Sequence, residues 1–232
     1  MINWKIRPHT EAFIEKHTNN LDDDDWWDIS RFQKLSESFI EKHADRVCWY
    51  YICSYQKLSE KFIEKQSDKV DWCAVSYYQK LSEDFIERHA DKVCWVYINL
   101  YQKLSEKFRK KHNIKTSRNN WLYKSTAFKK KAVQNTGLYD CHEDYFIAYK
   151  GIRSNRYSRY NFQYKYEKGG VYESTADFTA EENSFGLSAW TEEKARSYCN
   201  ELVVRVKIYY KDVARVVHVG GKIRATKIEI LD

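Results

Sequence analysis

The stretch Tyr55-Gln-Lys-Leu-Ser-Glu-Lys-Phe-Ile-Glu-Lys-Gln66 occurs four times in this 232-residue chain, with small changes between the copies. The other copies are Phe32–His43, Tyr78–His89 and Tyr101–His112. Their common glutamine recurs every 23 residues, at Gln33, Gln56, Gln79 and Gln102. A period of this length is typical of a stack of one small structural unit that packs against its neighbours. The first half of the chain is therefore predicted to be a repeat array, with degenerate copies in residues 11–32.

Each unit is predicted to form two short helices. Leu58, Phe62 and Ile63 recur at helical spacing, and Ser59 can cap the helix that carries them. Asp68 is the predicted cap of the helix that follows. Such a pair cannot bury its apolar side chains alone, so neighbouring units must stack.

Two other slots of the repeat recur, one with tryptophan and one with histidine, and a short acidic run lies in the N-terminal part of the array. The tryptophans are expected to fill the seams between units, with a ladder that stacks a ligand as the alternative; they are Trp26, Trp49, Trp72 and Trp95. The histidines are expected to be residues at helix C-termini: His17, His43, His89 and His112. Because Gln66 takes their place in one unit, they are not read as metal ligands. Asp22–Asp25 is read as a helix start, so no metal site is expected.

The composition indicates an ordered protein from a reducing, intracellular compartment. All seven glycines lie at or after Gly137, as expected if a helical array precedes them. None of the six cysteines forms a C-x-x-C pair, and Cys48 and Cys94 share a slot with Asp71. A disulfide framework or a structural zinc site would not tolerate that exchange. No apolar run approaches the ~20 residues that cross a bilayer, so no membrane association is expected.

The net charge of +7 comes from one short segment. Residues 107–135 carry 10 basic and no acidic side chains, whereas residues 1–106 carry 15 basic and 19 acidic ones. The segment is interpreted as a solvated helix face and linker, with contact to nucleic acid or to an acidic protein surface as alternatives. The nucleic-acid candidates are Arg109, Lys110, Lys111, Lys129, Lys130 and Lys131. The predicted domains are a repeat array at 1–112, a basic junction at 113–136 and a C-terminal domain at 137–232.

The C-terminal part is predicted to be a small α+β domain with a mostly antiparallel sheet. Alternating apolar residues predict strands over 160–166 and 204–210. Gly169-Gly170 and Gly220-Gly221 predict two hairpins, the second joining 213–219 to 222–231. Residues 191–201 read as a helix, capped by Thr191.

Two features of this domain are candidates for binding an anion or a nucleotide. The first is a group of arginines, Arg153, Arg156 and Arg159, and the second is the helix start with Ser188 and Thr191. The alternative is that Ser188 and Thr191 only cap the helix and the arginines are surface charges. The sequence contains no recognisable Ser-His-Asp or Cys-His nucleophile set.

The repeat, with Val-x-Trp-x-x-Ile between its copies, resembles the tandem repeats of uncharacterised proteins from giant viruses of amoebae, of the mimivirus and marseillevirus kind. The resemblance continues through Asn120–Thr126, Tyr145–Arg153, Asn183–Trp190 and Gly220–Arg224. It implies a viral origin and a location in the host cytoplasm or the viral factory. That family has no settled activity, so the resemblance implies a layout and no reaction.

The C-terminal domain is also similar to the ADP-ribosyltransferase fold. In that fold an arginine on the first strand, a Ser-Thr-Ser-like strand and a late glutamate hold nicotinamide adenine dinucleotide (NAD). Arg153, Ser188 and Glu229 are the positions that this resemblance implies. The chain has Ser-Ala-Trp where Ser-Thr-Ser is expected.

The sequence therefore favours a non-enzymatic interaction or adaptor protein. The helical array would bind a host or viral protein, and the C-terminal domain would act as a specific reader. One alternative is an ADP-ribosyltransferase-like or nucleotide-binding domain, the only reading that requires a cofactor, NAD. The other is nucleic-acid binding through the basic junction.

Overall fold

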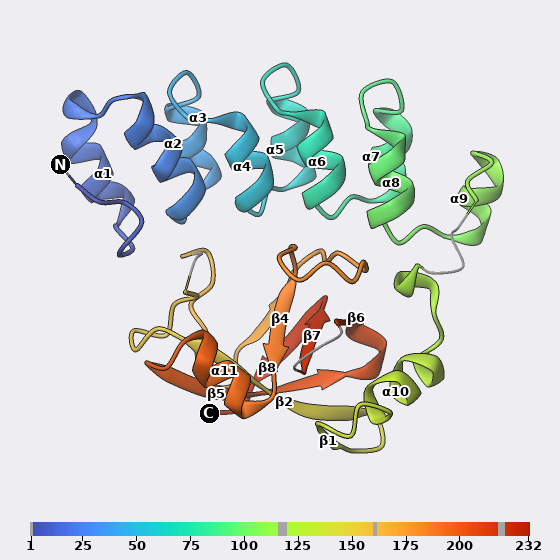
Figure 1. The fold of residues 1–232 in the computed structure, drawn as a ribbon. Coiled ribbons are helices and arrows are strands. Elements are labelled where there is room, and N and C mark those ends of the chain that lie inside the picture. The colour runs from blue at the N-terminus through green and yellow to red at the C-terminus, as the bar shows by residue number, and fades with distance from the viewer. Residues whose placement is uncertain (1, 116–119, 160–161, 218–220) are drawn as a thin grey trace. The chain divides into compact units, whose positions relative to one another are not determined.

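The computed structural model describes residues 2–115, 120–159, 162–217 and 221–232 (Figure 1). The chain divides into two compact units. One comprises residues 1–98 with 160–164, and the other residues 99–159 with 165–232. Short helices come first and an antiparallel sheet with further helices follows, so the predicted fold class, α then α+β, is confirmed.

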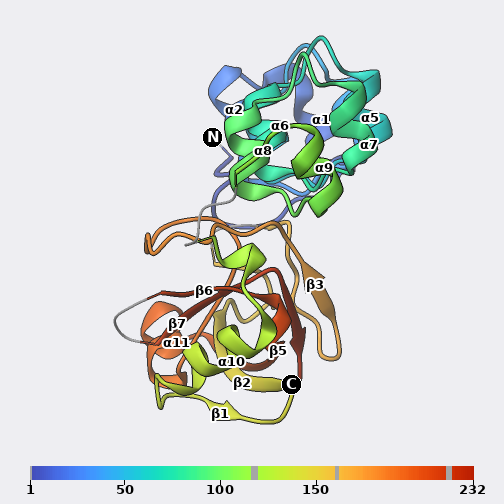
Figure 2. The ribbon, with the colours of Figure 1, turned by 90° about the vertical axis from the view of Figure 1, so that its right-hand side faces the viewer.

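The first unit is a row of short paired helices. They are α1 (Glu11–His17), α2 (Asp23–Phe32), α3 (Glu37–Lys42), α4 (Trp49–Tyr55), α5 (Glu60–Lys65), α6 (Trp72–Tyr78), α7 (Glu83–Arg88) and α8 (Trp95–Tyr101), of which α8 ends in the second unit. Figure 2 shows the row end-on, with α1, α5 and α7 on one side and α2, α6 and α8 on the other. The first helices of the pairs thus form one layer and the second helices another.

The helix starts are set by capping side chains. Ser36, Ser59 and Ser82 accept hydrogen bonds from the backbone N–H three residues on, at 3.1–3.2 Å, as predicted. The predicted cap Asp68 is wrong. It lies in a turn, and α6 is capped by Asp71, whose carboxylate accepts from the Ala74 N–H at 2.8 Å.

The recurring glutamine joins each unit to the one before it. Gln56 accepts a hydrogen bond from the Leu35 N–H at 3.1 Å and donates to the carbonyl oxygens of Ser30 and Gln33 at 3.0 and 2.9 Å. At the start of the array the segment before α1 takes the place of a unit, since the Arg7 carbonyl accepts from Gln33 at 3.2 Å. Buried polar groups in the seams are thereby satisfied.

The tryptophans lie in the seams between units, as predicted. The indole N–H of Trp72 donates to the Ser67 carbonyl at 3.0 Å, and its ring stacks on Phe85 of the next unit at 6.1 Å. Trp49 packs on Phe62 in the same way, at 6.3 Å. These rings fill space between helices.

The second unit contains an eight-stranded antiparallel sheet. Its strands are β1 (Asp140–Cys141), β2 (Tyr145–Ile152), β3 (Val171–Glu173), β4 (Leu187–Trp190), β5 (Leu202–Tyr209), β6 (Val213–Val217), β7 (Lys222–Ala225) and β8 (Lys227–Ile230). The order is β3-β8-β5-β2-β4-β7-β6, and β1 pairs with β2. The helices are α9 (Glu106–Lys111), α10 (Thr126–Gln134) and α11 (Glu192–Tyr198). A Cβ on Gly151 of β2 would lie 2.3 Å from the Ala195 carbonyl oxygen, so this glycine lets α11 pack closely on the sheet.

The strand predicted over 160–166 and its hairpin are wrong. Tyr160 and Asn161 lie outside the described residues, and 162–166 form a turn with one isolated bridge, from Lys165 to Tyr157. The backbone of Tyr166 is instead bonded to Arg156 on both sides. After Gly170, β3 pairs with β8. The second predicted hairpin is confirmed for β6 and β7, although Gly220 lies outside the described residues and the chain continues as the separate strand β8.

Candidate functional site

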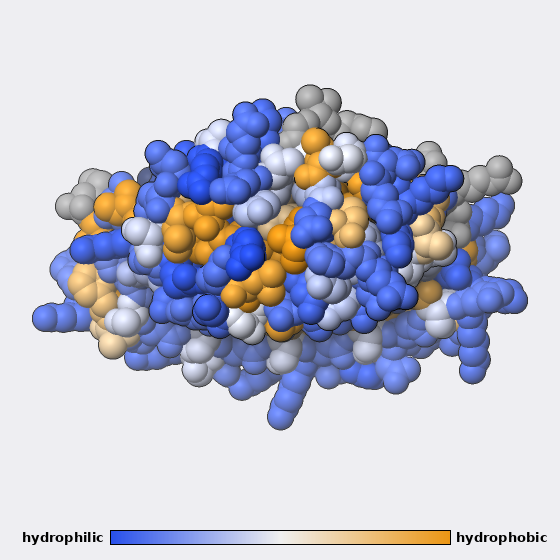
Figure 3. Space-filling model, turned by 90° about the horizontal axis from the view of Figure 1, so that it is seen from below, coloured by the Kyte–Doolittle hydropathy of each residue, from blue (hydrophilic) through white to orange (hydrophobic). Residues whose placement is uncertain are grey.

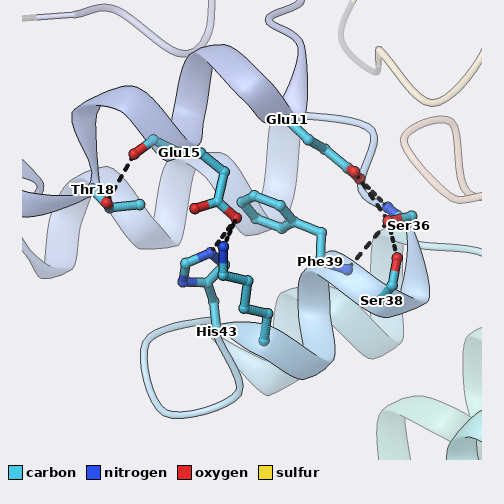
Figure 4. A network of polar contacts seen from close by, with 8 residues as sticks. Glu11, Glu15, Thr18, Ser36, Ser38, Phe39 and His43 are labelled. Carbon is cyan, nitrogen blue, oxygen red and sulfur yellow. Dashed lines mark hydrogen bonds and ion pairs between the residues drawn. The ribbon is translucent and has the colours of Figure 1, made fainter.

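Recurring charged side chains of the first-helix layer bind the neighbouring unit (Figure 4). Glu11 accepts hydrogen bonds from the N–H and hydroxyl of Ser36, and Glu15 accepts from Lys42 and His43 at 2.9 Å each. The equivalent pairs in later units are Glu37 with Ser59, Glu60 with Ser82, Glu41 with Lys65, and Glu64 with Arg88. These recurring charges hold the array together.

The histidine slot is also a packing position. His43 is 4.6 Å from the Phe39 ring and 4.9 Å from the Trp26 ring, in addition to its contact with Glu15. The predicted position at the helix C-terminus is confirmed, since His43 is the C-cap of α3, but the ring contacts were not foreseen. Within the described ranges no group of His, Cys, Asp and Glu side chains could hold a metal ion.

The second-helix layer differs because its outward positions change from unit to unit. One exposed slot holds Trp27, Tyr50, Cys73 and Val96, and a half-exposed slot holds Arg31, Ser54, Tyr77 and Leu100. Aromatic side chains occur in these changing slots and in neighbouring positions of the second helices, one of which stays aromatic in every copy. We call this set the tyrosine strip: Trp27, Phe32, Tyr50, Tyr51, Tyr55, Tyr77, Tyr78 and Tyr97. Trp27 and Tyr50 are 54% and 49% exposed, well above what a packing role requires.

The rings of the tyrosine strip contact one another across units. The Arg31 guanidinium lies 5.5 Å from the ring centres of both Tyr51 and Tyr55, and Tyr77 meets Tyr97 edge-on at 4.9 Å. Because these contacts already hold the rings in place, little further side-chain conformational entropy is lost when a partner binds to them.

The structure does not bring together Arg153, Ser188 and Glu229. The Arg153 guanidinium donates to the Arg159 carbonyl at 2.9 and 3.2 Å. Ser188 lies on β4 and Glu229 on β8, and strands β2 and β5 lie between them in the sheet. Glu229 forms an ion pair with Lys207 at 3.5 Å. These three residues therefore form no common site for NAD.

The other predicted anion ligands are also spread out. Arg156 donates to the carbonyls of Tyr166 and Asp232 at 2.7 Å each, and it holds a loop. Thr191 caps α11, a helix of seven residues, with a 3.4 Å bond from the Lys194 N–H.

Arg159 lines a surface hollow of about 350 Å³ together with residues 196–201. Its guanidinium lies over the Tyr198 ring at 5.4 Å. Glu201 also lines the hollow and accepts from the Ser154 N–H at 3.0 Å. A carboxylate at this place opposes the binding of an anion.

The basic junction does not present its cations as one group. Lys129 is 5% exposed and donates to the Lys211 carbonyl at 3.0 Å, so it is not available to phosphate. Lys130 donates to the Glu143 carbonyl at 2.6 Å, Lys110 pairs with Glu106, and Arg109 lies over the Tyr123 ring. Lys111 and Lys131 are exposed. Residues 116–119 lie outside the described part of the chain.

One unusual residue was missed by the sequence reasoning. Lys150 on β2 is 7% exposed, and its Nζ donates to the Ser188 carbonyl at 2.7 Å. The same atom lies 4.9 Å from the Tyr166 ring and 5.7 Å from the Trp190 ring. Burial, with a smaller effect of the Lys222 charge, lowers the pKa of Lys150 to about 7. Side chains alternate between the two faces of a strand, so Lys150 lies on the same face of β2 as the buried Ala148. This alternation could have identified Lys150 from the sequence.

The cations on strand β5 are paired with carboxylates. Figure 3 views the molecule from the side on which β1 and β2 lie in Figure 1, and hydrophobic residues gather near the centre of that side. Arg205 pairs with Asp232 at 2.6 Å and Lys207 with Glu229 at 3.5 Å. Because Arg205 and Lys207 each pair with a carboxylate, these two cations are not free to bind phosphate groups.

No protein-family model, no curated protein and no solved structure matches the chain. None of the helices in the described part is long and apolar enough to cross a membrane.

Proposed function

We propose that the chain is a non-enzymatic interaction protein whose helical array binds a protein partner along the tyrosine strip. One observation carries the proposal. Within a single chain, the slots that bind neighbouring units stay the same, whereas the outward slots of the second helices change. A repeat scaffold that presents a specific surface has this pattern.

The chemistry of the tyrosine strip fits a protein better than a phosphate-bearing ligand. Tyrosine and tryptophan side chains supply large, rigid contact areas with a polar atom at one end. Residues 49–55 and 95–101, which form α4 and α8, carry no charged side chain. A partner's polypeptide can pack on the rings and hydrogen-bond to the hydroxyl groups.

The second unit would act as the specific reader of the same assembly. The resemblance of the repeats to those of giant amoebal viruses supports a viral origin and a partner from the host or the virus. The expected location is intracellular, in the host cytoplasm or the viral factory.

The test is affinity capture from amoebal lysate with the full chain, followed by titration of the purified partner. The variant Trp27→Ser/Tyr50→Ser/Tyr77→Ser should weaken that titration by about tenfold or more, which is about 1.4 kcal/mol. The matched control, Lys16→Ser/Lys61→Ser/Lys107→Ser, changes three exposed side chains of the first helices and should leave the affinity unchanged. Circular dichroism shows whether each variant is folded. Capture of no protein above the tag alone, or equal affinity for the strip variant, would contradict the proposal.

A further inference from the structure

A lysine follows the recurring glutamine in every copy of the repeat. Lys34, Lys57 and Lys80 lie in the compact part formed by residues 1–98 with 160–164, and Lys103 is their counterpart in the last copy of the repeat. All four are exposed. None of them forms a hydrogen bond or ion pair within the described part of the chain.

This absence of partners sets the lysine slot apart from the recurring glutamates of the first helices. The slot of Glu37 and Glu60 binds Ser59 and Ser82, and the slot of Glu41 and Glu64 binds Lys65 and Arg88. Contacts between units thus give a structural reason for those residue types to recur. No such contact explains the lysines, so their recurrence points to something outside the chain.

The lysines lie beside one end of the tyrosine strip. Each comes two residues after the aromatic residue that ends a second helix, as Lys57 follows Tyr55 and Lys80 follows Tyr78. Helices α2, α4 and α6 pack side by side. Packed helices lie about 8–10 Å apart, so the lysines form a row with about that spacing.

We propose that this row binds an extended, acidic segment of the partner, with a carboxylate at about every third residue. An extended polyproline II segment has three residues per turn and rises about 3.1 Å per residue, so every third side chain lies on the same face at a spacing of about 9 Å, which matches the row. The inference rests on the proposed function and adds the chemistry of the partner to it. A peptide is favoured over nucleic acid because a nucleic-acid strand carries a phosphate at every nucleotide, so most of its charges would meet no lysine of the row and would face an array whose residues 1–106 carry 19 acidic and 15 basic side chains.

The experiment measures fluorescence anisotropy of labelled probes with the purified full chain. One peptide has glutamate at every third position with serine and threonine between, and a second peptide of the same composition has all its glutamates together. The third probe is a single-stranded oligothymidylate of similar length. The protein variants are Lys34→Gln/Lys57→Gln/Lys80→Gln and the control Lys16→Gln/Lys61→Gln/Lys107→Gln, which removes the same number of charges.

The spaced peptide should bind several-fold more tightly than the clustered one. The row variant should weaken its binding about tenfold or more, while the control variant leaves it within about twofold. Equal binding of the two peptides, tighter binding of the oligonucleotide, or an unchanged row variant would overturn the inference. If the variant Trp27→Ser/Tyr50→Ser/Tyr77→Ser still weakens binding of the captured partner in that case, the proposed function stands. Only the inference that the partner binds through an acidic segment is then rejected.

Discussion

The side-chain amide of Gln79 donates to the backbone carbonyl of Gln56, its counterpart one unit earlier, at 2.8 Å. The same amide donates to the Cys53 carbonyl at 2.6 Å, and its oxygen accepts from the Leu58 N–H at 3.1 Å. One side chain thereby satisfies three backbone groups of the preceding unit. This contact, repeated along the array, defines the register in which the units stack.

Replacing Gln79 should therefore lower the free energy of unfolding by more than the loss of a single hydrogen bond would. Gln79→Leu leaves three buried backbone groups without a partner, and each costs about 1–3 kcal/mol. We expect a loss of about 3 kcal/mol or more in the free energy of unfolding, measured by urea titration with circular dichroism. Lys80→Gln, the exposed neighbour, should change it by less than about 0.5 kcal/mol. Similar urea midpoints for the two variants would show that the recurring glutamine contacts contribute little to the free energy of unfolding.

A comparison of two units predicts a stabilising substitution. Asp71 caps α6 with a 2.8 Å bond, whereas Cys48, in the same slot, caps α4 without any side-chain bond. Cys48→Asp should increase the free energy of unfolding by about 0.5–1 kcal/mol, and Asp71→Ala should decrease it by about 1 kcal/mol. Thermal unfolding of the two single variants and of wild type measures both changes. A destabilised Cys48→Asp protein would mean that burial of the carboxylate outweighs the cap.

The contact between Glu15 and its partners predicts a dependence on pH. Hydrogen bonds from Lys42 and then His43 lower the pKa of Glu15. Because the folded state holds the proton less tightly, the stabilisation is present above the unfolded pKa and disappears as pH falls through the folded pKa. Glu15→Gln should cost about 0.5–1 kcal/mol at pH 7 and progressively less as pH falls from 7 through the folded pKa. Urea midpoints for wild type and variant across this range provide the test, and a gap that stays constant would contradict it.

The buried amine of Lys150 predicts a second increase of stability with pH, in a higher pH range. Its folded pKa is about 7, whereas an unfolded lysine titrates near 10.4. Between these values the unfolded chain binds the additional proton, so stability rises with pH by up to about 1.4 kcal/mol per unit. Lys150→Met should remove that slope, so that the variant's advantage over wild type shrinks steadily between pH 7 and pH 10. Parallel urea curves for the two proteins at every pH would show that Lys150 does not titrate in this range.

Local patterns along the chain predicted the array well. The 23-residue period, the serine caps and the tryptophan seams depend on contacts within one unit or between adjacent copies, and repetition displays those contacts in the sequence. The cap of the second helix was misplaced by three residues. Asp68 and Asp71 both precede Trp72, the first residue of α6. Only the structure shows that Asp71 is the residue that caps the helix.

The candidate sites of the second unit were harder to predict because they depend on strand order. Glu229 lies in a predicted strand, whereas Ser188, expected at a helix start, lies in strand β4, and nothing local to either residue states that β2 and β5 separate them. The burial of Lys129 was hidden for the same reason, since its partner, the Lys211 carbonyl, lies 82 residues away in sequence.

The sequence alone determined the repeat, the helix pairs and the change to an antiparallel sheet, because hydrophobic periodicity and capping act over a few residues. Only the tertiary structure decided which recurring charges are used between units and which, like Lys57, are not. The same holds for the aromatic residues, which divide between the seams and the tyrosine strip. Whether a side chain is buried or exposed depends on the neighbouring unit or strand, and that neighbour is placed only when the whole chain folds.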